Sequence, residues 1–469
     1  MPETFERQID LPVNVEEAFA WHERAGALDR LIPPWARVTV NQPGNGIRDG
    51  SVVELVQQLG AIKLKWIAKH YDYHPGRSFR DTQVAGPFAY WDHLHDIRPK
   101  GDGNGVLTDH IKYRVPCGIV GRLLGGAIIK RKVETMFMYR HNTTRDDLAA
   151  HAKHKEKGVM NVAITGASGL VGSTLVPMLT TGGHRVTKLV RRAARNSAVT
   201  WDPQAESFDA SSLDGVDAVV HLAGENIAAA RWSPKVKARI RDSRVQGTRV
   251  LCEGLARMKT PPKVLVCASA VGFYGDRDDE VLTEDSAAGS GFLANVARDW
   301  EAATQPARDA GIRVVKLRFG VILSPKDGAL AKMLLPFKLG AGGRVGSGRQ
   351  YWSWISIDDA AGAIHHALMT DSLSGPVNAV AQNPVTNAEF TKTLGRVLVR
   401  PTIVPMPAFA ARLALGEMAD QLLLASIRVE PRQLIESGYD FRQPTLESAI
   451  RHLLGKPAYP GSDIDRDEI

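Results

Sequence analysis

The chain of 469 residues has few cysteines: Cys117, Cys252 and Cys267 lie far apart, and none forms a C-x-x-C pair. This scarcity excludes a disulfide framework and a cysteine zinc site, and it favours buried, reduced thiols in a cytoplasmic protein. The sequence also lacks any run of about 20 uncharged apolar residues, so no membrane span is expected. The polar N-terminus has no apolar segment of the kind that a secretory signal requires.

A strong charge of either sign is also absent. The 59 Lys and Arg residues against 51 Asp and Glu residues give a formal charge of +8, which is mild for this length. Because no RRM, zinc-finger or helix-turn-helix pattern accompanies this charge, nucleic acid is not expected as a partner. The hydrophobic content of 44% is sufficient for packed cores, and the length predicts two or three domains.

The first third of the chain alternates like β-structure, with Gly and Pro between the segments. The pattern predicts strands at residues 5–11, 37–42, 51–58, 61–73, 78–84, 90–99 and 105–115. Asn14, with Glu17 three positions later, predicts the N-cap of a short helix after the first strand. Apolar residues spaced three or four apart predict a long helix over residues 119–150.

These elements make an α+β domain over residues 1–152. Their order, together with Phe137-Met138-Tyr139-Arg140-His141 in the last helix, resembles the START-like helix-grip superfamily, the SRPBCC group. In that superfamily a curved sheet wraps the long helix, so the resemblance implies a ligand-binding domain with an apolar ligand between sheet and helix. A filled core without a ligand is the alternative. The polar, charged residues 153–159 are expected to form a linker.

From residue 160 to 469, strands alternate with helices. Strands are expected at residues 161–165, 184–191, 218–222, 264–268 and 313–319, with helices at 233–255 and 294–310 among those between them. This alternation predicts an α/β doubly wound parallel sheet of the Rossmann type.

A glycine turn with the spacing G-x-x-G-x-x-G spans Gly166 to Gly172, directly after the first of these strands. The turn leads into a helix, and a helix start offers free N–H groups and the positive end of its dipole to an anion. The sequence therefore predicts that a dinucleotide pyrophosphate binds here. The expected contacts are Gly166, Ser168, Gly169, Leu170 and Val171.

Arg191 and Arg192 follow the second strand, where a carboxylate would bind the ribose hydroxyls of NAD. A guanidinium suits a 2′-phosphate instead, so NADP(H) is the expected cofactor. Small residues at the ends of later strands let the backbone approach a ligand, whereas His221 is expected to be a buried, hydrogen-bonded histidine. The residues assigned to the cofactor path are Leu222, Ala223, Gly224 and Ala268.

Several motifs occur in the order typical of one family. They are Thr165-Gly-Ala-Ser-Gly-Leu-Val-Gly172, His221-Leu-Ala-Gly-Glu-Asn226, Ser269-Ala-Val-Gly-Phe-Tyr-Gly275 and Arg318-Phe-Gly-Val-Ile-Leu323. Together they resemble the extended short-chain dehydrogenase/reductases, and more narrowly the atypical epimerase-family proteins often labelled sugar-nucleotide epimerases. The resemblance implies an NAD(P)-binding Rossmann domain with a C-terminal substrate-binding portion and a small-molecule substrate.

The chain departs from that family at the catalytic Tyr-x-x-x-Lys pair. With Glu301 matched to the glutamate usual on that helix, Leu293 falls at the tyrosine position and Ala297 at the lysine position. Neither side chain transfers a proton. Ser269 and Tyr274 remain as the catalytic candidates, and a purely structural role for both is the alternative.

Two hypotheses of different class follow. The first is an NADP(H)-binding, epimerase-like or oxidoreductase-like protein that moves a hydride to or from a carbinol or carbonyl carbon. The second is a non-catalytic protein that senses NADP(H) or binds an apolar ligand in its first domain, which the missing Tyr and Lys favour. The sequence leaves open whether the protein is an enzyme, and it predicts neither the substrate nor the oligomeric state.

Overall fold

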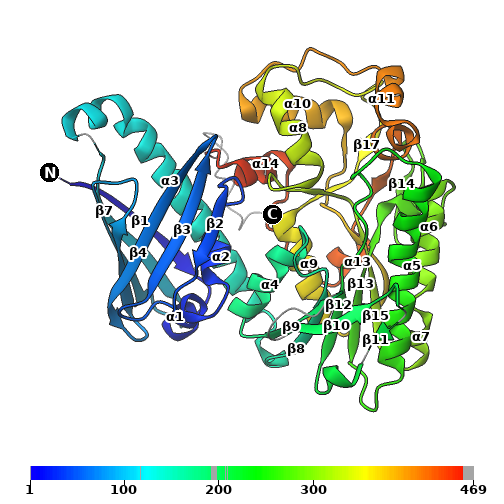
Figure 1. The fold of residues 1–469 in the computed structure, drawn as a ribbon, viewed down its shortest axis with the longest axis horizontal. Coiled ribbons are helices and arrows are strands. Elements are labelled where there is room, and N and C mark those ends of the chain that lie inside the picture. The colour runs from blue at the N-terminus through cyan, green and yellow to red at the C-terminus, as the bar shows by residue number, and fades with distance from the viewer. Residues whose placement is uncertain (1, 117, 192–197, 206, 209, 458–469) are drawn as a thin grey trace. The chain divides into compact units, whose positions relative to one another are not determined.

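The computed structural model describes residues 2–116, 118–191, 198–205, 207–208 and 210–457, and its contacts divide into two compact units (Figure 1). One unit comprises the residues up to Gly158, together with Pro177–Gly183 and the segment after Arg451. The other comprises Val159–Val176 and His184–Arg451. The expected division of function between residues 1–152 and 160–469, with a linker at 153–159, stays a prediction.

The first unit is built on a seven-stranded antiparallel sheet in the order β1-β7-β6-β5-β4-β3-β2. Its strands are β1 (Glu3–Leu11), β2 (Val38–Gln42), β3 (Val52–Leu59), β4 (Ile62–His74), β5 (Ser78–Ala85), β6 (Tyr90–Pro99) and β7 (Gly105–Arg114). The helices are α1 (Val15–Glu23), α2 (Ala27–Leu31) and the 35-residue α3 (Gly118–Ala152). The predicted cap of α1 is confirmed, because the Asn14 side chain accepts a hydrogen bond from the Glu17 amide at 3.0 Å.

The long helix α3 covers one face of this sheet. Its Phe137 is fully buried against Trp91 on β6 and against Ile111 and Tyr113 on β7. A second cluster joins α1 to the same sheet through Phe19, among other apolar side chains. The sequence-based prediction of an α+β domain with a long last helix is therefore confirmed at the level of its elements.

The second unit is built on an eight-stranded sheet in the order β11-β10-β9-β8-β12-β13-β15-β19. Its strands are β8 (Asn161–Thr165), β9 (Arg185–Val190), β10 (Ala198–Asp202), β11 (Ser207–Phe208), β12 (Ala218–His221), β13 (Val264–Ala270), β15 (Arg313–Phe319) and β19 (Gly375–Ala379). All of these pairings are parallel except the one between β10 and β11. The strand order reverses between β8 and β12, which confirms the doubly wound architecture.

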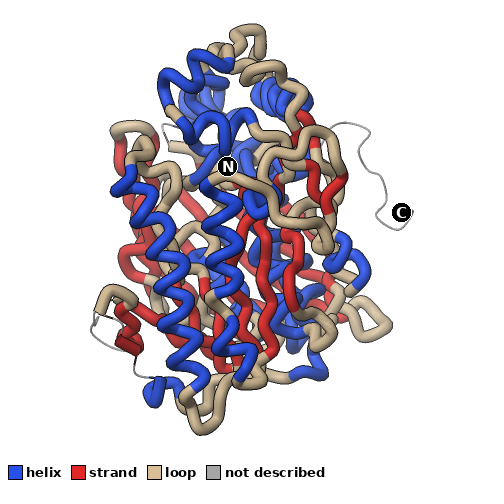
Figure 2. The backbone as a smooth tube through the Cα atoms, turned by 90° about the vertical axis from the view of Figure 1, so that its right-hand side faces the viewer, coloured by secondary structure: helices blue, strands red, loops and turns tan. Residues whose placement is uncertain are grey.

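The helices α5 (Pro234–Ala256), α6 (Phe292–Ala302) and α7 (Gln305–Asp309) lie together on one face of this sheet (Figure 2). Leu251 and Leu255 of α5 are fully buried in a cluster with Val219 and Leu265 of the central strands. The prediction of a single helix over residues 294–310 is wrong, because α6 ends at Ala302 and α7 begins at Gln305.

The remaining elements are further helices and short β-pairs, and two of these helices have residues in both units. The helices are α4 (Gly172–Thr181), α8 (Gly328–Lys338), α9 (Ile357–Met369), α10 (Asn387–Leu398), α11 (Ala408–Leu415), α12 (Glu417–Ala419), α13 (Arg432–Glu436) and α14 (Leu446–Leu454). The pairs are β14 (Val281–Leu282) with β21 (Arg428–Val429), β16 (Val321–Leu323) with β18 (Trp354–Ser356), and β17 (Tyr351–Trp352) with β20 (Val385–Thr386). Across the described ranges, no helix combines the length and apolar character that crossing a bilayer requires.

The thiols that the structure describes agree with the sequence-based prediction. Cys252 and Cys267 are buried and free. Burial raises the pKa of the Cys252 thiol to about 12 and that of Cys267 well above its ordinary value, so both stay protonated. Cys117 lies outside the described residues.

Candidate functional site

The glycine turn after β8 is pressed closely against the chain that follows β12. Gly166 has a φ of +69°, and a Cβ built there would lie 2.8 Å from the Leu222 carbonyl carbon and 2.9 Å from the Ala223 nitrogen. A Cβ at Gly172 would overlap the carbonyl oxygen of Gly166. Only glycine fits both positions, so the spacing found in the sequence is a steric requirement of this turn.

The predicted cofactor-binding residues gather at one edge of the parallel sheet. In the sheet register Thr165 lies beside His221, and His221 beside Cys267, so three strands end at the same edge. Ser168 and Gly169 are exposed in the glycine turn. The other contacts in this group are partly or fully exposed: Gly166, Leu170, Val171, Leu222, Ala223, Gly224 and Ala268.

Arg191 lies one residue beyond the end of β9, the strand next to β8, and it is exposed. Arg192 falls outside the described residues. The exposed turn between β8 and α4 and the cation after β9 stand at the switch point of the sheet, where doubly wound folds hold nucleotides. These residues therefore fit a dinucleotide with an anionic group near Arg191.

His221 stabilises the edge of the sheet formed by β8 and β12 through hydrogen bonds to two threonines. Its Nδ1 lies 2.7 Å from the Thr165 hydroxyl and its Nε2 lies 3.0 Å from the Thr248 hydroxyl, so it joins β8, β12 and α5. The Thr165 hydroxyl also accepts hydrogen bonds from the amides of Leu222 and Ala223. Burial lowers the pKa of His221 to about 3, which keeps the ring neutral. The prediction of a buried, hydrogen-bonded histidine is confirmed.

A buried ion pair lies at the ends of β13 and β15. The Arg318 guanidinium donates to both carboxylate oxygens of Glu301, Nε to Oε1 at 2.8 Å and Nη2 to Oε2 at 3.0 Å. The Ser269 hydroxyl also donates to Oε1, at 2.7 Å. All three side chains are nearly inaccessible to solvent. Burial lowers and Glu301 raises the pKa of Arg318, with a net increase, so the guanidinium stays charged.

Tyr274 is fully buried beside this pair. Its hydroxyl donates to Asn378 Oδ1 at 2.7 Å and accepts from Arg318 Nη1 at 2.8 Å. Burial is the main cause that raises the pKa of Tyr274, which is the opposite of what a tyrosinate-like base needs. Ser269 and Tyr274 are thus joined through Arg318, and both hydroxyls have protein partners in this structure.

The sequence motifs point to Ser269 and Tyr274 but not to the ion pair that joins them. One signal was available: Arg318 stands between Leu317 and Phe319 on an inner strand of the sheet, and a charged residue that is buried there needs a counter-charge. Glu301 on α6 supplies that charge, although it had served only to align the helix.

The positions that match the family's Tyr and Lys carry apolar side chains on α6. Leu293 lies against the segment that follows β13. A Cβ built on Gly272 in that segment would be 3.4 Å from the Cβ of Leu293. Ala297 is buried. The described part of this site therefore offers an exposed glycine turn at the start of a helix and a hydrogen-bonded polar network, with no proton-transferring group at either of these two positions.

Comparisons with known proteins agree with this architecture. Residues 162–379 match the NAD dependent epimerase/dehydratase family, and residues 406–453 match a domain of unknown function (DUF1731). The epimerase family protein MT2273 of Mycobacterium tuberculosis is 46% identical over 63% of this chain and 98% of its own length. The human epimerase family protein SDR39U1 is 37% identical over 63% of this chain and 100% of its own length.

Two solved structures are similar as well. The nucleoside-diphosphate sugar epimerase from Corynebacterium glutamicum is 36% identical, with a TM-score of 0.79, over 96% of this chain and 90% of that one. Human SDR39U1, isoform 2, solved with NADPH, is 35% identical, with a TM-score of 0.59, over 63% of this chain and 99% of that one. On this evidence the chain belongs to the NAD-dependent epimerase/dehydratase family, among the atypical short-chain dehydrogenase/reductases called epimerase family proteins.

Proposed function

We propose that this chain binds NADP(H) at the edge formed by β8, β12 and β13 and acts on a small-molecule substrate as an epimerase-like or oxidoreductase-like protein. The observation that carries the proposal is the close approach of Gly166 to Leu222 and Ala223, which leaves the amides of the turn at the switch point. The NADPH-bound structure of the human relative supports the choice of cofactor.

Each group of residues has its own role in this proposal. Ser168, Gly169, Leu170 and Val171 bind the pyrophosphate at the start of α4. Leu222, Ala223, Gly224 and Ala268 line the path toward the reacting end. Arg191 and Arg192 bind the 2′-phosphate. When bound, the nicotinamide would supply hydride transfer to or from a carbinol or carbonyl carbon.

The arginine assignment predicts a selective loss of cofactor affinity. In Arg191→Ala/Arg192→Ala, we expect NADPH to bind about 10- to 100-fold more weakly, because each charge-assisted hydrogen bond contributes roughly 1.5–3 kcal/mol. NADH, which lacks the 2′-phosphate, should change little. Titrations that follow nicotinamide fluorescence measure both dissociation constants.

Arg185→Ala is the matched control for this test, because Arg185 is equally exposed but lies at the opposite end of β9. It should leave both affinities unchanged. An equal loss of NADPH and NADH affinity in the double variant would show that the two arginines do not distinguish the phosphate.

The glycine turn predicts a second loss of affinity, one that affects both cofactors. Alanine at position 172 would meet the carbonyl oxygen of Gly166, and the turn must open to relieve the overlap. We expect Gly172→Ala to weaken NADPH and NADH alike by at least tenfold, since a misplaced turn no longer directs its amides at the phosphates. Ser173→Ala, at the exposed neighbour, is the control. Unchanged affinity in Gly172→Ala would place the cofactor elsewhere.

Ser269 and Tyr274 are the proposed catalytic residues, and their contacts define what they must do. Tyr274 has to exchange its hydrogen bond to Asn378 for one to substrate, while Ser269 has to turn from Glu301. If Tyr274 transfers a proton, Tyr274→Phe lowers kcat by about 10²- to 10⁴-fold while cofactor affinity is kept. A change of kcat below about threefold would leave Tyr274 as a packing residue.

A second candidate function is a non-catalytic NADP(H) sensor. Leu293 and Ala297 on α6 favour it, because they remove the family's usual proton donor and its partner. The two functions differ in one measurement, the oxidation of bound NADPH in the presence of a broad panel of carbonyl compounds. Turnover establishes the enzyme, whereas tight binding without turnover establishes the sensor.

For the first unit we propose a START-like helix-grip domain that binds a ligand between its sheet and α3. The proposal is supported by the seven-stranded antiparallel order and by the terminal 35-residue helix. Native mass spectrometry of the purified full chain tests it, because a retained apolar ligand would appear as a defined mass increase. We also propose that the whole chain is located in the cytoplasm.

A further inference from the structure

The inner face of the antiparallel sheet carries two histidines and two aspartates in adjacent positions. Asp81 on β5 pairs directly with His93 on β6, and His95 on β6 pairs directly with Asp109 on β7. Because side chains two residues apart on a strand share a face, all four side chains lie on the same side. We call them the His93–His95 cluster.

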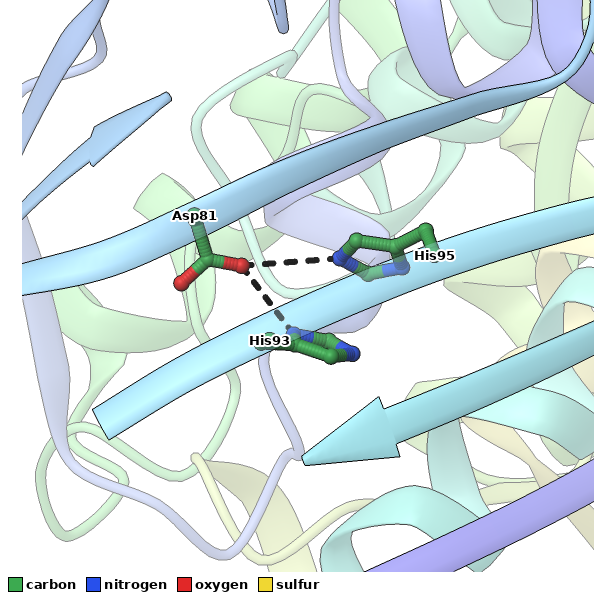
Figure 3. A group of neighbouring side chains, drawn as sticks. All are labelled: Asp81, His93 and His95. Carbon is green, nitrogen blue, oxygen red and sulfur yellow. Dashed lines mark ion pairs between the residues drawn. The ribbon is translucent and has the colours of Figure 1, made fainter. Parts of the chain in front are cut away.

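The two aspartates contact the two imidazoles from opposite sides. One oxygen of Asp81, Oδ2, lies 3.0 Å from His93 Nδ1 and 3.6 Å from His95 Nε2 (Figure 3). One oxygen of Asp109, Oδ1, lies 2.9 Å from His93 Nε2 and 2.8 Å from His95 Nδ1. Each imidazole therefore has one nitrogen toward Asp81 and the other toward Asp109.

Asp109 is itself held in place from α3. The His141 Nε2 lies 2.6 Å from the second oxygen of Asp109, and both side chains are almost completely buried. A neutral imidazole has one N–H and one lone pair. When Asp109 accepts the N–H of His93, the lone pair of that ring is directed at Asp81, whereas His95 Nδ1 lies close to Asp109 without hydrogen-bond geometry. A carboxylate behind a histidine is the usual outer partner of a metal-bound imidazole.

We propose that Asp81, His93 and His95 bind a divalent transition-metal ion and that Asp109, which lies behind both imidazoles, orients His93. The three ligand atoms lie within 4.8 Å of one another. Metal–ligand bonds of about 2.0–2.2 Å place neighbouring ligand atoms about 3–3.5 Å apart. The two distances from Asp81 to the histidine nitrogens, 3.0 and 3.6 Å, lie close to this range. Two imidazoles and one carboxylate suit Zn²⁺ or Fe²⁺ and leave coordination positions open for a water or a small ligand.

A proton is the competing occupant of this cluster. Burial lowers and the charges of Asp81 and Asp109 raise the pKa of His93, to about 9. The same contacts thus stabilise an imidazolium when no ion is bound, and a divalent ion would take the place of its proton. A cluster that serves only as a buried ion pair binds no metal, so metal uptake separates the two roles.

The test uses the full chain without an affinity tag, freed of metal by a chelator and titrated with Co²⁺ and Zn²⁺. We expect one equivalent to bind, visible ligand-field absorption with Co²⁺, and a higher Tm on addition of Zn²⁺. Asp81→Asn and His93→Gln should each weaken binding at least 100-fold. Asp109→Asn, which removes an orienting group, should weaken it about 10- to 100-fold.

His110→Gln is the matched control, because His110 lies on β7 next to Asp109 but is partly exposed and pairs with Glu6. It should leave the stoichiometry and affinity unchanged. Failure of the unmodified chain to bind either ion overturns the proposal, whatever the variants do. Uptake that is equal in the unmodified chain and in a folded Asp81→Asn variant overturns it as well.

Discussion

Arg318→Met is expected to destabilise the parallel-sheet unit by about 3–5 kcal/mol, the usual cost of removing one partner of a buried ion pair. The substitution leaves the Glu301 carboxylate buried with the Ser269 hydroxyl and with Lys316, whose Nζ is 3.8 Å away. It also removes the donor to the Tyr274 hydroxyl. The midpoint of urea unfolding, with its m-value, measures the loss.

Two further variants show how much of the stability lost in Arg318→Met comes from the buried ion pair. Arg277→Met breaks a pair with Glu280 that is largely exposed, and surface pairs of this kind contribute at most about 1 kcal/mol. Arg318→Met/Glu301→Leu removes both charges, so most of the stability should return. If Arg318→Met costs no more than Arg277→Met, the buried pair does not hold the ends of β13 and β15 together.

The antiparallel sheet was predictable because its signals are local. Gly and Pro turns bound each strand, so every predicted strand of this sheet agrees with an observed one to within a residue or two. The pairing across strands is not local. His93 and His95 alternate visibly on one strand, but Asp81 and Asp109 become their neighbours only through the register. The sequence interpretation therefore missed the cluster, although an H-x-H pattern in a half-apolar strand is a usable signal.

The parallel sheet shows where local signals fail. The sequence predicts no strand at β10, β11 or β19, and β19 begins with Gly375-Pro376, a pair that argues against a strand. The predicted helix over 294–310 is interrupted before Pro306, which stands in the first turn of α7. A short strand at or near the edge of a sheet is stabilised mainly by hydrogen bonds to the adjacent strand. That adjacent strand lies outside the short segment itself, so a local pattern does not reveal the pairing.

The candidate site likewise has one part that the sequence predicts and one part that it does not. The glycine turn could be predicted, because the steric need for Gly166 and Gly172 arises within a few residues and from one adjacent strand. The link from Ser269 through Glu301 and Arg318 to Tyr274 requires α6 to pack on β13 and β15, and no spacing in the sequence encodes it. This network also shows that the hydroxyls chosen by motif are already hydrogen-bonded within the protein.

The stability of the folded chain at acid pH depends on His221. In the unfolded chain this histidine takes up a proton near its ordinary pKa of 6.5, whereas burial keeps the folded one neutral down to about pH 3. The unfolded state therefore binds more protons between these values, and stability is full above about pH 6.5 and falls as the pH is lowered. The slope is about 1.4 kcal/mol per pH unit for this one group.

His221→Gln keeps a side chain that can hydrogen-bond to Thr165 and Thr248 but removes the titration. We expect this variant to be less stable than the unmodified chain at neutral pH, because glutamine fits the two hydroxyls less well, and to lose less on acidification. Between about pH 7 and pH 4.5, the gap in urea midpoint should narrow by the equivalent of about 2–3 kcal/mol. A constant gap would mean that His221 is solvated or protonated in the folded protein, and the edge that presents Leu222 and Ala223 would then not depend on a neutral ring.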